Sequence, residues 1–412
     1  MNTQEIITQY IDTHHAEQVE FLRQIVRVPS DTPPGDNNPP AEKAAELLTA
    51  KGYKVERFAV PELRVRDYGM ESVTNLIVRH KFGSGGPTIA LNAHGDVVPP
   101  GDGWSFDPYG GEVKDGRMYG RGVAVSKSDI ASFTFALDAL KAAEKAGTKL
   151  NGTVELHLTY DEEFGGLLGP GYLLEINATK PDFVIGASFS YAIVTAHNGC
   201  LQFEVTVHGT ATHGAMPETG DDALQAANAI LSAIYGKLPD LGKIKSKVAG
   251  ITSPTLLVGQ INGGTNTNVV PGKVVLKMDR RMIPEENPAA VEAQVRSMIE
   301  GAVAGKTGIR VEIKRLLLAN AMKRVPGQAP LVAALQKHGE RIFGEPIPAI
   351  GVPLYTDARI YGEAGIPVVL YGAGPRTVPE SNAKRADENL LLEDLRKATQ
   401  VVACAVADLL AA

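Results

Sequence analysis

The chain has 412 residues, with 47 acidic and 41 basic side chains and a formal net charge of −6 at pH 7. A chain of this length exceeds the size at which a single hydrophobic core stops growing, so two domains are expected. The charges form no long run of one sign, which excludes the basic surfaces that bind nucleic acid or anionic membranes. The partner that this composition favours is a small soluble molecule.

The sequence also indicates a compartment. Residues 1–30 carry several carboxylates among their apolar residues, which excludes the apolar core of a secretory signal. No apolar stretch reaches membrane-spanning length. Cys200 and Cys404 are the only cysteines, and because neither belongs to a metal-type cluster we expect two buried thiols. These features predict a cytoplasmic protein that does not bind a membrane.

Helical and β-rich segments alternate over the first half of the chain. Apolar residues at helical spacing predict a long helix over 5–28, which Pro29 ends, and a second helix over 41–51. This alternation predicts an α/β domain with a mostly parallel sheet flanked by helices. The other elements predicted here are the strands 54–58, 74–78, 88–93, 153–158 and 183–185 and the helix 129–146.

A different order of elements follows in the second half. Strand, helix, two strands, helix and strand succeed one another, an order that suits a small inserted ferredoxin-like α+β module. Two helices over 329–343 and 392–410 and an apolar run over 367–371 then return to the α/β pattern. We therefore predict a discontinuous α/β domain of residues 1–199 and 314–412 and an inserted domain of residues 200–313.

Polar side chains follow the predicted strand 88–93. His94 and Asp96 stand two positions apart at its end, and the carboxyl ends of strands are where open α/β sheets place their sites. A histidine whose second nitrogen is held by a carboxylate is typical of metal-bound and catalytic imidazoles. Taken alone, the pattern fits a hydrogen-bonded surface loop equally well.

Three adjacent carboxylates follow the predicted strand 153–158. Asp161, Glu162 and Glu163 repel one another, so they need a cation or a proton to be stable at a strand end. A general base beside a metal ligand is one use of such a group, because a carboxyl with a raised pKa can take a proton from water. An exposed acidic turn is the alternative.

Further motifs extend along the chain in a set order: Tyr119-Gly120-Arg121-Gly122, then His213, Asn268, Arg281 and the turn 371–374. Together with His94-Gly95-Asp96 and Asp161-Glu162-Glu163, they resemble the acetylornithine deacetylase, succinyl-diaminopimelate desuccinylase, aminoacylase and glutamate carboxypeptidase family of metallopeptidases. The resemblance covers nearly the whole chain. It implies a catalytic α/β domain and an inserted domain that serves as a lid and joins two copies into a homodimer.

The resemblance implies a role for each matching residue that would take part in the chemistry. It makes His94 a metal ligand that Asp96 orients, Glu162 the general base and Glu163 a second metal ligand. His213 would reach across the dimer interface and help to stabilise the oxyanion, because a tetrahedral intermediate needs fixed donors.

The resemblance also implies a substrate. Asn268 and Arg281 would bind a substrate carboxylate, helped by the backbone amides of Gly372 and Gly374, because a guanidinium suits a carboxylate in a bidentate manner. A salt bridge within the lid is the alternative role of Arg281. The implied function is hydrolysis of a C–N bond in a small carboxylate-bearing substrate, such as an N-acyl amino acid or a dipeptide.

The metal ligands of the family are mostly missing. The family places a bridging aspartate four residues after the motif arginine, where this chain has Val125. It places another carboxylate after a strand such as 181–186, where this chain has only Ala187, Ser188, Phe189 and Ser190. It places a histidine four residues before a glutamate, and the residue in that position before Glu388 is Lys384.

Each of the family's two metal positions therefore keeps one ligand. His94 and Glu163 together could hold one divalent ion, zinc or manganese, with a helper such as Asp129, His197 or Asp161. The competing interpretation has no metal: Lys384 neutralises the acidic pair and is the centre of metal-independent chemistry on the same fold. A protein that binds a ligand without turnover is the third alternative.

Overall fold

The chain folds into two units, which we describe separately. The computed structural model describes residues 1–411. The first unit consists of Met1–Thr195, Arg324–Ile350 and Thr356–Ala412, and the second of Ala196–Lys323 and Gly351–Tyr355. The second unit thus begins four residues before the predicted inserted domain and ends ten residues after it, with one short further segment.

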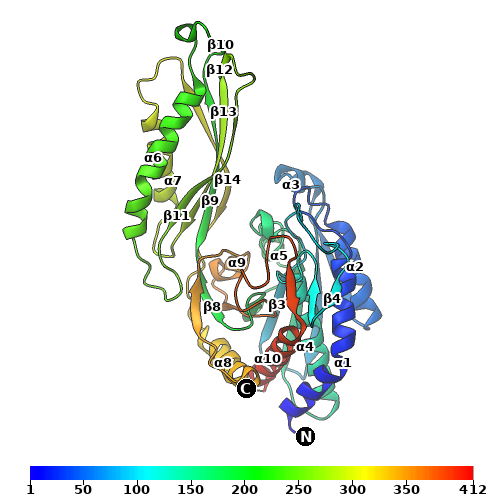
Figure 1. Cartoon of the computed structure of the whole chain (residues 1–412). Helices are drawn as coiled ribbons and strands as arrows, with labels where there is room; N and C mark the ends of the chain where they lie inside the picture. Colours follow the sequence, from blue (N-terminus) through cyan, green and yellow to red (C-terminus); the bar gives the residue numbers. More distant parts are fainter. Residues whose placement is uncertain (412) are drawn as a thin grey trace. The chain divides into compact units, whose positions relative to one another are not determined.

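An eight-stranded sheet runs through the first unit (Figure 1). The neighbouring strands β6, β3, β7 and β16 are parallel, whereas β1, β2 and β8 join antiparallel to their neighbours. The predicted α/β class with a mostly parallel sheet is therefore confirmed. In spatial order the strands are β1 (Val55–Ala59), β2 (Thr74–Phe82), β6 (Gly152–Thr159), β3 (Thr88–His94), β7 (Phe183–Gly186), β16 (Val368–Leu370), β8 (Ile193–His197) and β15 (Ala349–Val352).

Four long helices pack beside one another in this unit: α1 (Thr3–Val26), α4 (Lys127–Lys145), α8 (Ala329–Phe343) and α10 (Leu392–Leu410) (Figure 1). α4 contacts β3 and β6, and both α1 and α10 pack against α4. α4 is buried along most of its length, as expected for a helix between a sheet and two other helices. Asn2 and Glu5 form a capping box, which explains why α1 begins at Thr3.

Several short elements of the first unit were not predicted. They include a small sheet in which β5 (Arg117–Tyr119) pairs with β4 (Glu112–Lys114) and with β17 (Asn389–Leu391). Because β5 and β17 are far apart in the sequence, this pairing brings the segment that holds Lys384 beside the one that holds Val125. The remaining helices are α2 (Asn38–Ala50), α3 (Glu62–Asp67), α5 (Pro170–Glu175) and α9 (Arg359–Glu363).

The second unit is a four-stranded antiparallel sheet in the order β11-β13-β9-β14, with α6 and α7 packed together beside it. Its apolar core joins side chains of the strands to the buried face of α6, including Phe203, Leu276 and Ile230. A two-residue ladder joins β10 (Thr212–His213) to β12 (Val269–Val270). The main elements are β9 (Gly199–His208), α6 (Ala223–Lys243), β11 (Thr255–Gly263), β13 (Lys273–Met282), α7 (Pro288–Ala302) and β14 (Arg310–Ala319).

Among residues 1–411, no helix combines the length and the hydropathy that crossing a bilayer requires.

A buried polar network lies at β6. The Glu155 carboxylate accepts hydrogen bonds from Thr179 and Arg79 and lies 2.8 Å from His157 Nε2, while His157 Nδ1 lies 2.8 Å from the Tyr361 hydroxyl. Burial alone would raise the pKa of Glu155, but the hydrogen bond and positive charge of His157, with the bonds from Thr179 and Arg79, lower it to about 2. The ionised form is thus stabilised by folding.

This network predicts a specific acid sensitivity. Because the folded pKa of Glu155 lies below its unfolded value, its ionisation stabilises the fold above pH 4.5 and that contribution is lost as the pH falls towards 2. A shift of this size corresponds to about 3 kcal/mol. In urea titrations between pH 7 and pH 2, Glu155→Gln should lack this part of the pH dependence. Glu56→Gln, which alters a more exposed partner of Arg79, is the control, and a constant wild-type advantage over Glu155→Gln at all pH values would contradict the prediction.

Candidate active site

The ends of β3 and β6 lie side by side. The two strands are parallel and pair His94 with Thr159, so the residues that follow each strand emerge at the same edge of the sheet. The Gly95 amide donates to the Thr159 carbonyl at 2.8 Å. A Cβ atom on Gly95 would lie 2.3 Å from the Tyr160 ring, so only glycine fits where the two chains approach.

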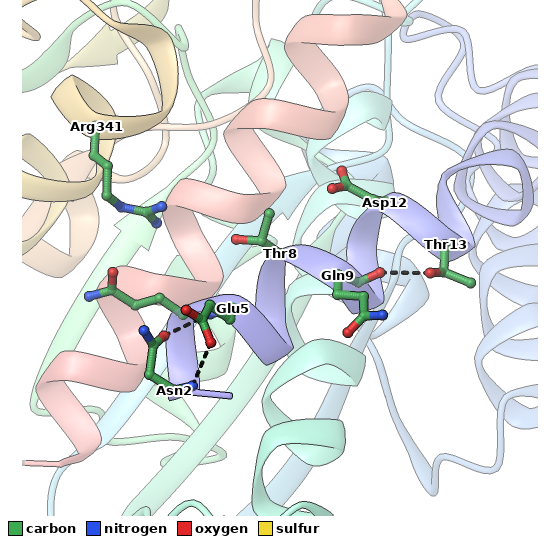
Figure 2. A pocket seen from close by; sticks show the side chains of 8 residues that line it. Asn2, Glu5, Thr8, Gln9, Asp12, Thr13 and Arg341 are labelled. Atoms are coloured by element: carbon green, nitrogen blue, oxygen red, sulfur yellow. Dashed lines mark hydrogen bonds between the residues drawn. The ribbon is translucent and has the colours of Figure 1, made fainter.

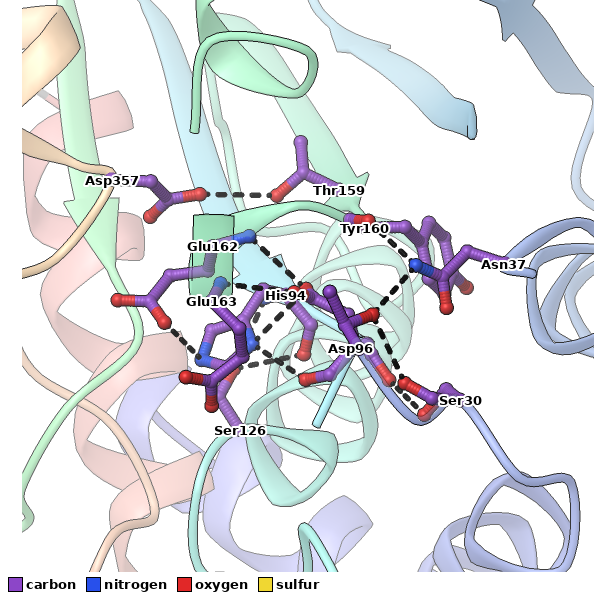
Figure 3. Close-up of polar contacts among 12 residues, drawn as sticks. Ser30, Asn37, His94, Asp96, Ser126, Thr159, Tyr160, Glu162, Glu163 and Asp357 are labelled. Carbon is purple, nitrogen blue, oxygen red and sulfur yellow. Dashed lines mark hydrogen bonds and ion pairs between the residues drawn. The ribbon is translucent and has the colours of Figure 1, made fainter. Parts of the chain in front are cut away.

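Asp96 holds the two strand ends together. Its carboxylate is completely buried and accepts hydrogen bonds from the backbone amides of Glu162 (3.2 Å) and Glu163 (3.0 Å) (Figure 3). His94 Nδ1 lies 3.0 Å from the Asp96 carbonyl oxygen and 3.4 Å from its Oδ1. Asp96 therefore positions both the imidazole and the turn that carries the acidic pair.

Glu162 and His94 face each other in this buried site, with 3.9 Å between Glu162 Oε2 and His94 Nε2 (Figure 3). Burial raises the pKa of Glu162 to about 8, although the positive charge of His94 opposes the shift. Burial would lower the pKa of His94, but the negative charge of Glu162 and the hydrogen bond of Asp96 outweigh it and raise the pKa to about 10. An imidazolium thus lies beside a carboxyl group that can exchange a proton near neutral pH.

Lys384 contacts the second carboxylate of the pair. Its Nζ lies 2.6 Å from Glu163 Oε2, and the lysine side chain is 51% exposed whereas that of Glu163 is only 7% exposed. Burial would lower the pKa of Lys384, but the negative charges of Glu163 and Glu162 outweigh it and raise the pKa. The ammonium group is therefore charged and partly accessible to solvent.

Asp129, Asp161 and Asp357 are buried carboxyl groups of the same unit. Burial raises the pKa of Asp129 to about 8 and that of Asp357 to about 6. Burial and the charges of Asp96 and Asp357 raise the pKa of Asp161 well above its usual value. Thr159 Oγ1 donates to Asp357 at 3.3 Å, which joins the segment just before α9 to the end of β6 (Figure 3). Asp357 was not among the site residues predicted from the sequence.

The backbone amides proposed to bind a substrate carboxylate have acceptors within the chain. The Gly372 amide donates to the Phe189 carbonyl and the Gly374 amide to the Ser188 carbonyl. Between them, the Ala373 amide donates to Asp129 Oδ1 at 2.6 Å. A substrate carboxylate would have to replace these acceptors, and the role of this turn in substrate binding stays a prediction.

The other predicted residues lie in the second unit. His213 and Asn268 are exposed and close together, since the Gly214 amide donates to the Asn268 carbonyl at 2.7 Å. Arg281 makes a salt bridge with Asp279 at 2.7 Å and stacks on the Tyr355 ring, so the alternative of a salt bridge within the lid is present.

Arg281 is separated from His213 within this unit. It pairs with Cys200 near the start of β9, while Lys273 at the other end of β13 pairs with His208. His213 pairs with Val269, close to the Lys273 end. At about 3.4 Å per residue, the eight steps along the strand from Lys273 to Arg281 place the two ends about 27 Å apart.

The side chains present do not fit the family's metal centre. Val125 offers no donor, and Ala187 and Ser188 offer no carboxylate. Glu163, one of the two ligands that remain, is paired with Lys384. Among residues 1–411, no group of three or more His, Cys, Asp or Glu side chains is arranged to hold a metal ion. Of the proposed helpers, Asp129 bonds the Ala373 amide, Asp161 bonds the Leu168 amide, and His197 lies in the second unit.

One surface pocket lies elsewhere in the first unit, along α1 (Figure 2). Much of its polar lining is engaged locally, because Asn2 and Glu5 cap the helix and Thr13 bonds the Gln9 carbonyl. It contains no residue of the predicted site. Its lining consists of Asn2, Gln4, Glu5, Thr8, Gln9, Asp12, Thr13 and Arg341.

Comparison with known proteins identifies relatives over nearly the whole chain. The profile of Peptidase family M20/M25/M40 matches residues 90–408. The succinyl-diaminopimelate desuccinylase of Parvibaculum lavamentivorans is 29% identical over 398 residues, or 93% of each chain. Human carnosine dipeptidase 1 has a TM-score of 0.80 at 19% identity over 99% of both chains. The YXEP protein of Bacillus subtilis, described as a dinuclear metal binding peptidase, has a TM-score of 0.64 at 18% identity over 97% of this chain and 99% of its own.

Proposed function

This chain belongs to peptidase family M20/M25/M40 and is therefore a hydrolase, and we propose that it cleaves a C–N bond of a small amide that carries a carboxylate. N-acyl amino acids and dipeptides are the proposed substrate classes. The names of the relatives support this choice, since one removes a succinyl group from an amine and another cleaves dipeptides. Glu162, buried at the end of β6 and aimed at His94, is the observation that carries the proposal.

Glu162 is the proposed general base. A water molecule between its carboxylate and the substrate carbonyl would give up a proton to Glu162 as its oxygen bonds to the carbonyl carbon. The same carboxyl group would then deliver that proton to the departing amine nitrogen, which balances the reaction. Asp96 fixes the position of Glu162 through its backbone amide, so the base does not have to be ordered at the moment of reaction.

The reaction also requires stabilisation of the negative charge that develops on the carbonyl oxygen, and positive charge lies near Glu162. As the carbonyl carbon becomes tetrahedral, its oxygen gains negative charge, which nearby fixed cations stabilise. His94 lies 3.9 Å from Glu162, and Lys384 is held at the neighbouring carboxylate of Glu163. We propose that these two side chains supply that charge from within the first unit.

The direct experiment is a hydrolysis screen. Purified protein would be incubated with a panel of N-acyl amino acids and dipeptides, each matched with a derivative whose carboxylate is converted to an amide. We expect release of free amine from at least one class of carboxylate and a loss of about tenfold or more in kcat/KM for its amidated partner, because a charged hydrogen bond is worth about 1.5–3 kcal/mol. Equal rates on both members of each pair would refute a carboxylate-binding site.

We further propose that the second unit joins two copies of the chain. A small substrate cannot contact both His213 and Arg281 of one copy, because the two residues lie at opposite ends of the four-stranded sheet. A twofold dimer would let one copy supply Arg281 and the other His213 to the same site. We retain the expectation that this dimer works in the cytoplasm.

Shared sites predict complementation between two inactive variants. Glu162→Gln lacks the base and His213→Ala lacks the donor that its partner would supply, so each alone should be inactive. After unfolding and refolding of an equal mixture, half of the dimers should carry one complete site, which gives about one quarter of wild-type activity. Light scattering would establish the dimer, and separately refolded variants mixed afterwards are the control. Activity no higher than that of the control would exclude a shared site.

A further inference from the structure

The contact between Lys384 and Glu163 takes up a carboxylate that the family resemblance assigns to a metal ion. We propose that the ammonium group of Lys384 takes the place of a divalent ion in this site, so that the protein folds without a bound metal. The inference concerns the charge balance of the site rather than its substrate. It can therefore be tested without knowing the reaction.

The donors that remain are too few to hold an ion. Each metal position of the family keeps a single ligand in this chain, His94 in one and Glu163 in the other. Catalytic zinc requires three protein ligands and an open position. Val125 stands where the family has the carboxylate that bridges the two positions, and its isopropyl group cannot bind a cation. Ser188 offers no carboxylate in its place.

The chain positions Lys384 for this contact. Its backbone adopts the left-handed conformation, with φ of 62°, and its amide nitrogen lies 3.4 Å from Glu388 Oε2. Glu388 is itself fixed by an ion pair with Arg121, at 2.6 Å. The Glu163 amide is held by Asp96. Both ends of the contact are thus anchored through the backbone, which lowers the entropic cost of the ion pair.

The contact with Lys384 neutralises the charge of a buried carboxylate. Glu163 is 7% exposed, and burying a carboxylate without a nearby cation is energetically costly. In the metal enzymes the ion meets this need, and here an ammonium group at 2.6 Å does so. Lysine binds as a single point charge, so it neutralises one carboxylate and leaves Glu162 to face His94.

The test measures metal binding directly. The full-length protein would be purified without chelator, dialysed against zinc or manganese, passed through a desalting column and analysed for metal content. Wild-type protein should hold less than about one tenth of an ion per chain, and its melting temperature should not change with zinc, manganese or a chelator. One or more tightly held ions per chain, or a melting temperature that falls with chelator, would overturn the proposal.

A pair of variants tests whether Lys384 is the replacement. Val125→Asp with Lys384→His restores the carboxylate and the imidazole that the family resemblance assigns to these positions, so this double variant should hold about one zinc ion per chain and gain thermal stability when zinc is added. Val125→Asn with Lys384→Gln alters the same positions without strong ligands and should bind no more than the wild type. A folded double variant that still binds no zinc would overturn the role given to Lys384.

The wild-type measurement also decides the question if the double variant does not fold. Failure of this inference is distinguishable from failure of the proposed function, because metal content is measured without a substrate. Hydrolysis that a chelator abolishes would leave the hydrolase proposal standing and refute the metal-free site. Metal-free protein that hydrolyses nothing in the panel would leave the metal-free site standing and refute the hydrolase proposal.

Discussion

Glu162→Gln is expected to lower kcat by about 10²–10⁴-fold, the range that a positioned general base contributes. Glutamine has nearly the same shape as glutamate but cannot take a proton from water. Its backbone amide still donates to Asp96, so the turn should keep its position. Steady-state kinetics on the substrate found in the screen would measure the effect, and KM should change far less than kcat because the side chain acts in the transition state.

A matched control is available on the same unit. Glu175 lies on α5, is exposed and makes its ion pair with Arg64 at the surface, so Glu175→Gln should leave kcat unchanged. Circular dichroism would verify that both variants are folded. If Glu162→Gln turned over as fast as the control, Glu162 would not be the base and the proposed mechanism would be wrong.

Arg121→Met should reduce the free energy of unfolding by about 3–5 kcal/mol, because it leaves a buried charge without its partner. Arg121 and Glu388 side chains are each only 2% exposed, and Arg121 Nη1 lies 2.6 Å from Glu388 Oε2. The arginine also donates to the Pro100 carbonyl and stacks on Trp104. Chemical denaturation followed by fluorescence and circular dichroism would measure the loss.

Two comparisons separate the buried charge from other effects. Arg57→Met breaks an exposed ion pair with Glu42 and should cost less than about 1 kcal/mol. Adding Glu388→Met to Arg121→Met removes the stranded carboxylate and should recover part of the loss. If Arg121→Met lowered the free energy of unfolding as little as Arg57→Met, the Arg121–Glu388 ion pair would not stabilise the segment that holds Lys384.

The main outline of the fold could be predicted because it depends on local periodicity. α1 and α10 were predicted to within about two residues of their observed bounds, and β3 and β6 were found from their apolar runs. The short strand β17 escaped prediction because three residues carry no periodic signal, and only pairing with the distant β5 orders them.

The candidate site, like the fold, could be predicted only in part. The family resemblance assigned His94 and Glu162 to one site, and the structure brings them together because residues that follow adjacent parallel strands share one edge of a sheet. The contact of Asp129 with the Ala373 amide could not be predicted, since the two residues are 244 positions apart and no local sequence pattern indicates that the two segments meet. That contact lies in the turn between Gly372 and Gly374, whose use in substrate binding stays a prediction.

Asp96 affects how mutagenesis of this protein has to be interpreted. Its two carboxylate oxygens accept hydrogen bonds from the amides of Glu162 and Glu163. Its backbone carbonyl and Oδ1 lie close to His94 Nδ1, so one residue sets the position of three others. An inactive Asp96 variant therefore does not report on the histidine alone. Only structures of such variants, or substitutions at each dependent residue in turn, assign the loss to the imidazole, the base or the ion-paired carboxylate.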